Sequence, residues 1–172
     1  MTMPVAIENL NAVRIEPGVP IVLTVGTFDG IHLAHQALFR EAVALAKELG
    51  GKSAVLTFQN HPRSVVPSAK IPALLTDWKT KRDLISQCGI DLLVGIRFDE
   101  IFSQIPAEAF IRDVIAGRFH ASMVLSGPAF HFGHKGAGNP AMLAALASQF
   151  GYTYRQQEPV LLEGMKVSST LV

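Results

Sequence analysis

The chain alternates short, almost wholly apolar runs with longer stretches whose apolar positions recur at helical spacing. Residues 21–28, IVLTVGTF, are nearly continuous in apolar and β-branched side chains. Such a run is typical of a strand covered on both faces of a parallel sheet. Residues 32–51 follow with an apolar stripe through Leu38, Leu45 and Leu49. This pair predicts a buried strand followed by an amphipathic helix.

The same alternation continues to the end of the chain. Further strands are predicted at 53–58, 91–98, 121–127 and 152–167, and further helices at 77–89, 105–119 and 140–151. Strands alternating with helices in this way predict a three-layer α/β domain with a mainly parallel, five-stranded sheet. In such a sheet, ligands bind beyond the carboxyl ends of the strands, where the strand order reverses.

Local signals fix some of the expected element ends. Thr76 is placed to cap the helix over 77–89, and Pro140 is placed to begin the last helix. Glu163 and Gly164 suggest a hairpin within the final strand region.

Length and composition narrow the class of protein. The 172 residues fit a single domain over 1–172, and 15 basic side chains against 14 acidic ones create no strongly basic field. We therefore expect no nucleic-acid partner, because such binding depends on clustered Lys and Arg. No apolar run is long enough to predict a membrane span. Cys88 is the only cysteine, so we expect no disulfide framework and a cytoplasmic location. The sequence indicates no oligomeric state.

The loop after the first predicted strand carries the clearest candidate chemistry. Gly26 lets the backbone approach a ligand, and Thr27 adds a hydroxyl donor. His32 and His35 stand three residues apart at the start of the helix, so both should project from one side of its first turn. A helix N-terminus favours phosphate, and two imidazoles there can bind the same anion. Asp29 is expected to shape the loop.

Two other interpretations of these histidines stay open. A histidine at a helix start is often a capping or surface residue. His32 and His35 could also join His131 and His134 as two His-x-x-His pairs that bind a transition metal.

Four segments, in order, resemble the nucleotidyltransferases of the bacterial FAD synthetase type. The segments are GTFDGIHLAH at 26–35, VLTFQNHP at 55–62, LSGPAFHFGHKGAGN at 125–139 and VSSTLV at 167–172. The resemblance implies a Rossmann-like nucleotidyltransferase fold and transfer of AMP from ATP to FMN, giving FAD and pyrophosphate with the assistance of Mg²⁺.

The resemblance also implies a role for particular residues. His32 and His35 would stabilise the triphosphate of ATP during displacement at the α-phosphate, and Gly26 and Phe28 would carry the nucleotide loop. A second phosphate contact would come from Ser168, Ser169 and Thr170. On the flavin side, the matching residues are Phe58, His61, Pro62 and Phe130. Phe132 also matches, but a phenylalanine near a strand end is more often a core residue, so its role stays open.

The sequence departs from the family pattern at several positions. Ala34 replaces a glycine between the histidines, and Ala129 replaces a polar residue before Phe130. The family motif at 167–172 continues with an arginine after the position of Val172, and from these 172 residues we expect no riboflavin kinase domain. The metal ligands are not indicated. These departures leave an alternative, a catalytically impaired nucleotide- or flavin-binding paralogue; a related cytidylyl- or adenylyltransferase is a further alternative.

Overall fold

The computed structural model describes residues 3–62 and 77–158, together with the backbone of 161–162 and 165–166. Its main sheet has six strands in the order β1-β4-β3-β2-β5-β6, and every pairing between them is parallel. The strands are β1 (Val5–Ile7), β2 (Ile21–Val25), β3 (Lys52–Phe58), β4 (Leu92–Ile96), β5 (Met123–Ser126) and β6 (Thr153–Gln156). The predicted α/β class with a parallel sheet is confirmed.

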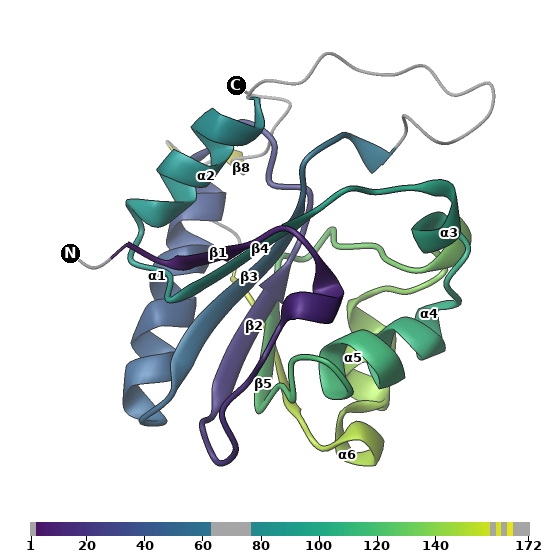
Figure 1. Cartoon of the computed structure of the whole chain (residues 1–172). Helices are drawn as coiled ribbons and strands as arrows, with labels where there is room; N and C mark the ends of the chain where they lie inside the picture. Colours follow the sequence, from purple (N-terminus) through teal and green to yellow (C-terminus); the bar gives the residue numbers. More distant parts are fainter. Residues whose placement is uncertain (1–2, 63–76, 159–160, 163–164, 167–172) are drawn as a thin grey trace.

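Helices cover both faces of this sheet (Figure 1). One face carries α1 (Leu33–Glu48) and α2 (Trp78–Ser86). The other carries α3 (Glu100–Ser103), α4 (Ala107–Ala109), the π-helical η3 (Phe110–Ala116), α5 (Pro140–Ala145) and α6 (Ala147–Phe150). Two short 3-10 turns, η1 (Leu10–Ala12) and η4 (His134–Gly136), lie in the connections. The three-layer prediction is therefore confirmed.

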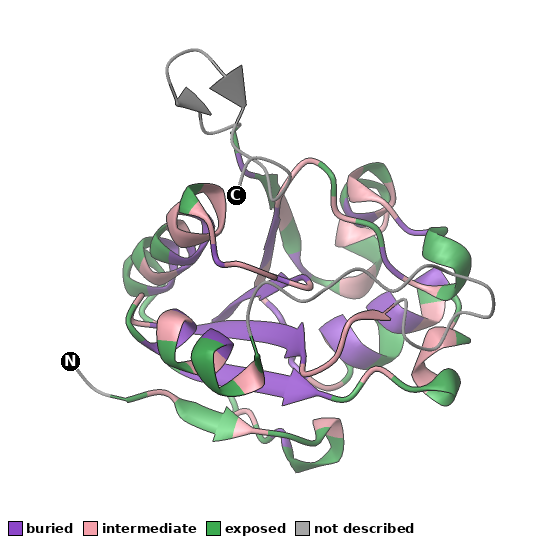
Figure 2. Cartoon of the chain, turned by 90° about the horizontal axis from the view of Figure 1, so that it is seen from above, coloured by how far each residue is buried: buried purple, intermediate pink, exposed green. Residues whose placement is uncertain are grey.

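Each face of the sheet has its own hydrophobic core, so the strands between the helix layers are buried (Figure 2). Ile21 and Leu23 of β2 pack in one core, whereas Val22 packs in the other with Phe39 of α1 and Ile85 of α2. Successive side chains of a strand point to opposite faces, which explains why β2 has no polar face in its sequence.

The sheet has one strand more than the sequence predicted. The additional strand, β1, has only three residues and lies at the edge, where Val5 is 63% exposed. A strand this short carries no readable apolar pattern, and its place depends on backbone pairing with β4.

Some predicted element ends also differ. Asp77, and not Thr76, is the N-cap of α2, because its side chain accepts a hydrogen bond from the Thr80 amide at 2.7 Å. Leu49 is exposed, so the buried stripe of α1 ends earlier than expected. β7 (Leu161–Leu162) pairs antiparallel with β8 (Met165–Lys166), as the predicted hairpin requires.

The strand order places the reversal point beside β2. From β2 the chain builds outward through β3 and β4 on one side and through β5 and β6 on the other. The carboxyl ends of these parallel strands meet at one edge of the sheet, so the segments that follow β2, β3 and β5 emerge together. All the predicted site residues before residue 140 lie in or beside these three segments. A ligand crevice is expected at this edge.

Candidate active site

The loop between β2 and α1 has an unusual backbone. The backbone φ values are +50° at Phe28, +83° at Gly30 and +41° at Ile31, in the left-handed region that residues other than glycine rarely adopt. The side chains of Phe28 and Ile31 are nevertheless buried, at 6% and 4% exposure. Packing therefore holds a strained loop in one shape, a feature that clusters at functional sites.

The two histidines lie together at the start of α1, as predicted. Their rings stack with centroids 3.7 Å apart and planes tilted by 22°. His32 is the N-cap residue of α1, but its side chain makes no capping hydrogen bond, so the capping interpretation is wrong. Nδ1 of both rings is buried, and neither atom has a hydrogen-bond partner in the part of the chain that the structure describes. Buried polar atoms without partners are rare and point to a functional role.

The surroundings of the histidine pair keep both rings uncharged at neutral pH. Burial, followed by the charges of His32 and Lys81, lowers the pKa of His35 from 6.5 to about 3, whereas Asp29 acts in the opposite direction. Burial also lowers the pKa of His32. A neutral imidazole can donate one hydrogen bond to an anion, and it adds no fixed positive charge that would retain a product.

Lys81 of α2 is a member of this site that the sequence analysis missed. It is 2% exposed, and its Nζ donates to the carbonyl oxygens of Thr27 at 2.6 Å and Phe58 at 3.0 Å. Burial lowers its pKa to about 8, against an opposing effect of Asp29. The sequence pattern could have indicated a buried lysine at this position. The helical spacing of Trp78, Lys81 and Ile85 places Lys81 in an apolar stripe.

Other contacts tie the same loop to the sheet. The Gly26 amide donates to the Leu56 carbonyl at 3.1 Å, and the Thr57 hydroxyl donates to the Thr27 carbonyl at 3.0 Å. Phe28 packs edge-on against His35, at 5.2 Å between centroids, and against Phe39, at 4.8 Å. The predicted nucleotide-loop residues are thus brought together with the histidine pair.

Gly26→Ala is expected to weaken both the fold and this arrangement. A Cβ at position 26 would lie 2.7 Å from two ring carbons of Phe28, whose ring is confined between His35 and Phe39. Overpacking of this kind costs roughly 1–3 kcal/mol. Denaturant unfolding would measure the loss. Gly127→Ala is the matched control, because a Cβ there meets nothing within 4 Å. Equal stability of the two variants would contradict the confinement of Phe28.

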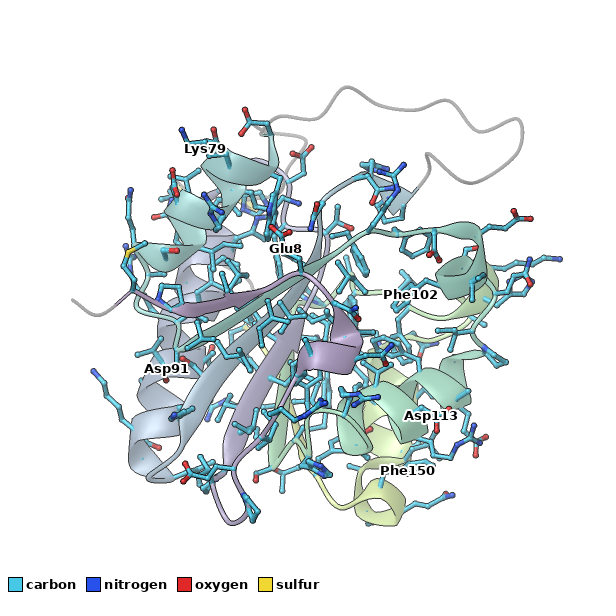
Figure 3. The ribbon with its side chains drawn as sticks, in the orientation of Figure 1. Glu8, Lys79, Asp91, Phe102, Asp113 and Phe150 are labelled. Atoms are coloured by element: carbon cyan, nitrogen blue, oxygen red, sulfur yellow. The ribbon has the colours of Figure 1, made fainter. Side chains whose placement is uncertain are left out.

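Two of the predicted flavin residues, Phe58 and Phe130, pack in the core on the face of the sheet opposite to α1, which carries the histidines. Phe58 is buried at the end of β3 and contacts Phe98 and Phe102 edge-on, at 5.2 and 5.6 Å. Figure 3 shows Phe102 on the side of α3, away from α2. Ring contacts continue from Phe102 through Phe110 and Phe132 to Phe130.

This row of rings connects Phe58 with Phe130, two residues that the sequence could not place relative to each other. Phe130 is half-buried and stacks on Phe132 with centroids 5.3 Å apart, whereas Phe132 is 7% exposed and belongs to the core. Phe98 and Phe102 are members of the row that sequence analysis missed.

The segment after β3 is held against the end of β4. Asn60 donates from Nδ2 to the Phe98 carbonyl at 2.8 Å, and its Oδ1 accepts from the Phe98 amide at 2.7 Å. His61 and Pro62 follow directly and are half-buried. They follow Asn60, which is bonded to Phe98 of the aromatic row, and their role on the flavin side of the site stays a prediction.

Other predicted residues fall outside this arrangement. Ser168, Ser169 and Thr170 lie outside the described residues. Nδ1 of His131 pairs with the Gly138 carbonyl at 3.2 Å, and Nδ1 of His134 pairs with the Ser103 carbonyl at 3.0 Å. Within residues 3–62 and 77–158, no group of three or more His, Cys, Asp or Glu side chains could hold a metal, so the four-histidine interpretation is wrong. No helix in these ranges is long and apolar enough to cross a membrane.

Sequence comparisons agree with the motif resemblance. The sequence family described as FAD synthetase matches residues 16–171. The bifunctional riboflavin kinase/FMN adenylyltransferase of Haemophilus influenzae is 33% identical over 162 residues, which cover 94% of this chain and 52% of the relative. The Listeria monocytogenes protein of the same name is 32% identical over 151 residues, or 87% and 47%. The chain spans about half the length of the curated relatives it matches.

Structural comparisons support the fold. A macrolide-efflux protein from Streptococcus pneumoniae superposes with a TM-score of 0.81 at 23% identity, covering 99% of this chain and 54% of that one. A pantothenate synthetase from Thermus thermophilus gives a TM-score of 0.60 at 18% identity, covering 96% and 66%. At these identities the likeness extends to the architecture alone.

Proposed function

Because the chain belongs to the FAD synthetase family, we propose that it transfers the adenylyl group of ATP to FMN. A phosphate oxygen of FMN would attack the α-phosphorus of ATP, the bond from that phosphorus to the bridging oxygen would break, and pyrophosphate would leave. The observation that carries the proposal is the stacked histidine pair at the N-terminus of α1, with both Nδ1 atoms buried and unpartnered in the described structure.

The histidine pair would stabilise the charge that develops on the departing pyrophosphate. The helix N-terminus contributes roughly half a positive charge, and the unpaired amides of the first turn point in the same direction. No described acceptor meets Nδ1 of His32 or His35, so the neutral tautomer with its proton on Nε2 avoids a buried, unpaired N–H. Each ring would then donate from Nε2 to a phosphate oxygen. Gly26, Thr27, Phe28 and Asp29 would shape the surrounding loop.

The aromatic row would receive the flavin. Phe130 is half-buried at the end of the row and would offer a ring face for an isoalloxazine, while Phe58, His61 and Pro62 would contribute from the end of β3 and the segment after it. Stacking of this kind adds to the free energy gained from apolar burial. Ser168, Ser169 and Thr170 would supply a second contact to phosphate. These assignments extend the family pattern to residues of this chain.

Mg²⁺ is the proposed accompanying cation. Mg²⁺ in nucleotide sites commonly keeps several waters and binds substrate phosphates with only one or two carboxylates. The described residues form no cluster of three or more metal-ligating side chains, so the phosphate oxygens of ATP would supply most of its ligands. When bound, it would offset part of the negative charge of the triphosphate. The free Cys88 supports a reducing compartment, and we propose the cytoplasm.

The competing proposal is a paralogue that binds nucleotide or flavin without turning it over. It rests on Ala34 and Ala129. Ala34 lies half-buried in the first turn of α1, and its carbonyl oxygen accepts a hydrogen bond from the side-chain Nε2 of Gln157 at 3.1 Å. Its methyl group therefore stands on a turn that is fixed in place. Ala129 is exposed.

Incubation of the protein with FMN, ATP and Mg²⁺ distinguishes the two proposals. We expect FAD and pyrophosphate to form in equal amounts, measured by chromatography and by a coupled pyrophosphate assay. Calorimetric titration with ATP and separately with FMN should be run on the same preparation. Binding of both ligands without FAD formation would favour the paralogue. Binding of neither would contradict both proposals.

A further inference from the structure

Lys81 is a buried cation to which the proposed reaction assigns no contact with either substrate. Its side chain is 2% exposed, and the described structure assigns its ammonium group no ion pair within 4.0 Å. Burial of an ammonium group is unfavourable and lowers the pKa of Lys81 to about 8, because the charge of Asp29, which acts in the opposite direction, offsets only part of the cost. An apolar side chain would fill the same space without the cost of burying a charge. The hydrogen bonds of the ammonium group therefore explain why a lysine stands here.

The ammonium group joins the two loops that carry the proposed substrate sites. The Thr27 carbonyl, at 2.6 Å, lies directly before Phe28, where the strained part of the nucleotide loop begins. The Phe58 carbonyl, at 3.0 Å, ends β3 and leads into the segment with His61. These carbonyls lie 54 and 23 residues from Lys81 in sequence. The Lys81 side chain thus fixes the loop between β2 and α1 relative to the end of β3.

The same charge acts on the histidine pair. The positive charge of Lys81 lowers the pKa of His35, and Asp29 raises it. Asp29 also raises the pKa of Lys81. The charged or titratable groups that influence His35 are therefore His32, Lys81 and Asp29, and Lys81 favours the uncharged state of His35 before a nucleotide arrives.

We propose that Lys81 is a positioning residue of this site, which holds the loop after β2 and the end of β3 in the geometry that both substrates require. This inference rests on the proposed function. Lys81 acts through Thr27, Phe58 and His35 and contacts no reacting atom. Misplacement of reacting groups by about 1 Å can cost on the order of a hundredfold in rate, so a cross-link between the loops has a large effect on turnover.

Lys81→Met tests the proposal, with Lys79→Met as the matched control. Lys79 is an exposed lysine on the same helix, labelled in Figure 3. For Lys81→Met we expect the pKa of His35, followed by NMR, to rise. The Kd for ATP should increase about tenfold, and kcat should fall more than KM for FMN rises. Lys79→Met should match the wild type in the pKa of His35, in the Kd for ATP and in kcat and KM. A lysine that only stabilises the fold would lower the thermal midpoint and leave the Kd for ATP and the kcat of the folded variant unchanged.

Two further variants keep the test decisive. Lys81→Gln removes the charge and retains an N–H donor, so it should raise the pKa of His35 even if Lys81→Met does not fold. Asp29→Asn should shift the pKa of His35 downward, opposite to the Lys81 variants. An unchanged His35 pKa and ATP affinity in a folded Lys81 variant would overturn the proposal. Both readouts are made without FMN, so failure of the FMN assignment in the wild type would be recognised separately.

Discussion

Replacing His35 by alanine is expected to lower the rate of FAD formation by roughly a hundredfold to a thousandfold. His35 stacks on His32 at the N-terminus of α1, where the departing pyrophosphate would bind. Removal of the ring deletes one hydrogen-bond donor and leaves His32 without its stacking partner. The effect should fall mainly on kcat/KM for ATP and on kcat, because the contact strengthens as charge develops. Steady-state kinetics with FMN in excess measures it.

The same replacement should leave the fold almost unchanged. The ring contributes an edge contact with Phe28, but its Nδ1 is a buried polar atom without a partner in the described structure, so the two effects on stability oppose each other. We expect a change in thermal midpoint of no more than about 4 °C, or roughly 1 kcal/mol. His120→Asn is the control, because His120 is exposed and asparagine tolerates its φ of +48°. Parallel losses of stability and activity in His35→Ala would argue against a catalytic role.

The second large effect is a loss of stability in acid. The pKa of His35 is about 3 in the folded chain, against 6.5 for an exposed histidine. Between these values the unfolded chain binds a proton that the folded chain does not, so stability falls as the pH falls. Each pH unit removes up to about 1.4 kcal/mol, and the whole window removes about 4 kcal/mol. Above pH 6.5 His35 makes no such contribution.

Urea unfolding of the wild type and of His35→Ala at several pH values between 7 and 3 measures this effect. The variant should lose less stability than the wild type over this window. Hydrogen bonds from Thr80 to Asp77 and from Arg112 to Asp113 lower the pKa values of both carboxyls, so these groups also destabilise the chain in acid. Their contribution is the same in both proteins and cancels in the difference. Identical pH dependence of the two proteins would show that His35 is not buried in its neutral form.

The structure departs from the sequence-based expectation at β1 and at the start of α2, because both depend on geometry that only the folded chain provides. β1 was missed because three residues carry no periodic pattern, and its position depends on pairing with β4. Thr76 was predicted as the N-cap of α2, whereas the Asp77 side chain meets the Thr80 amide. Adjacent cap candidates have similar propensities, so the final geometry of the turn decides between them.

The sequence by itself determined the alternation of strands and helices, the three-layer fold, and the family to which the chain belongs. It also indicated that His32 and His35, three residues apart at the start of a helix, lie close together. These properties are local or are written in the order of short motifs. Each can be obtained without knowing which distant residues meet.

Only the tertiary structure decided how the site is held and how it is charged. The contact of Lys81 with Thr27 and Phe58 joins three segments that are distant in sequence, and the aromatic row joins Phe58 to Phe130 across several elements. The low pKa of His35 follows from burial, from the neighbouring His32 and from Lys81 on another segment. Burial, desolvation and long-range contacts depend on the packing of the whole chain, and no local pattern of residues encodes them.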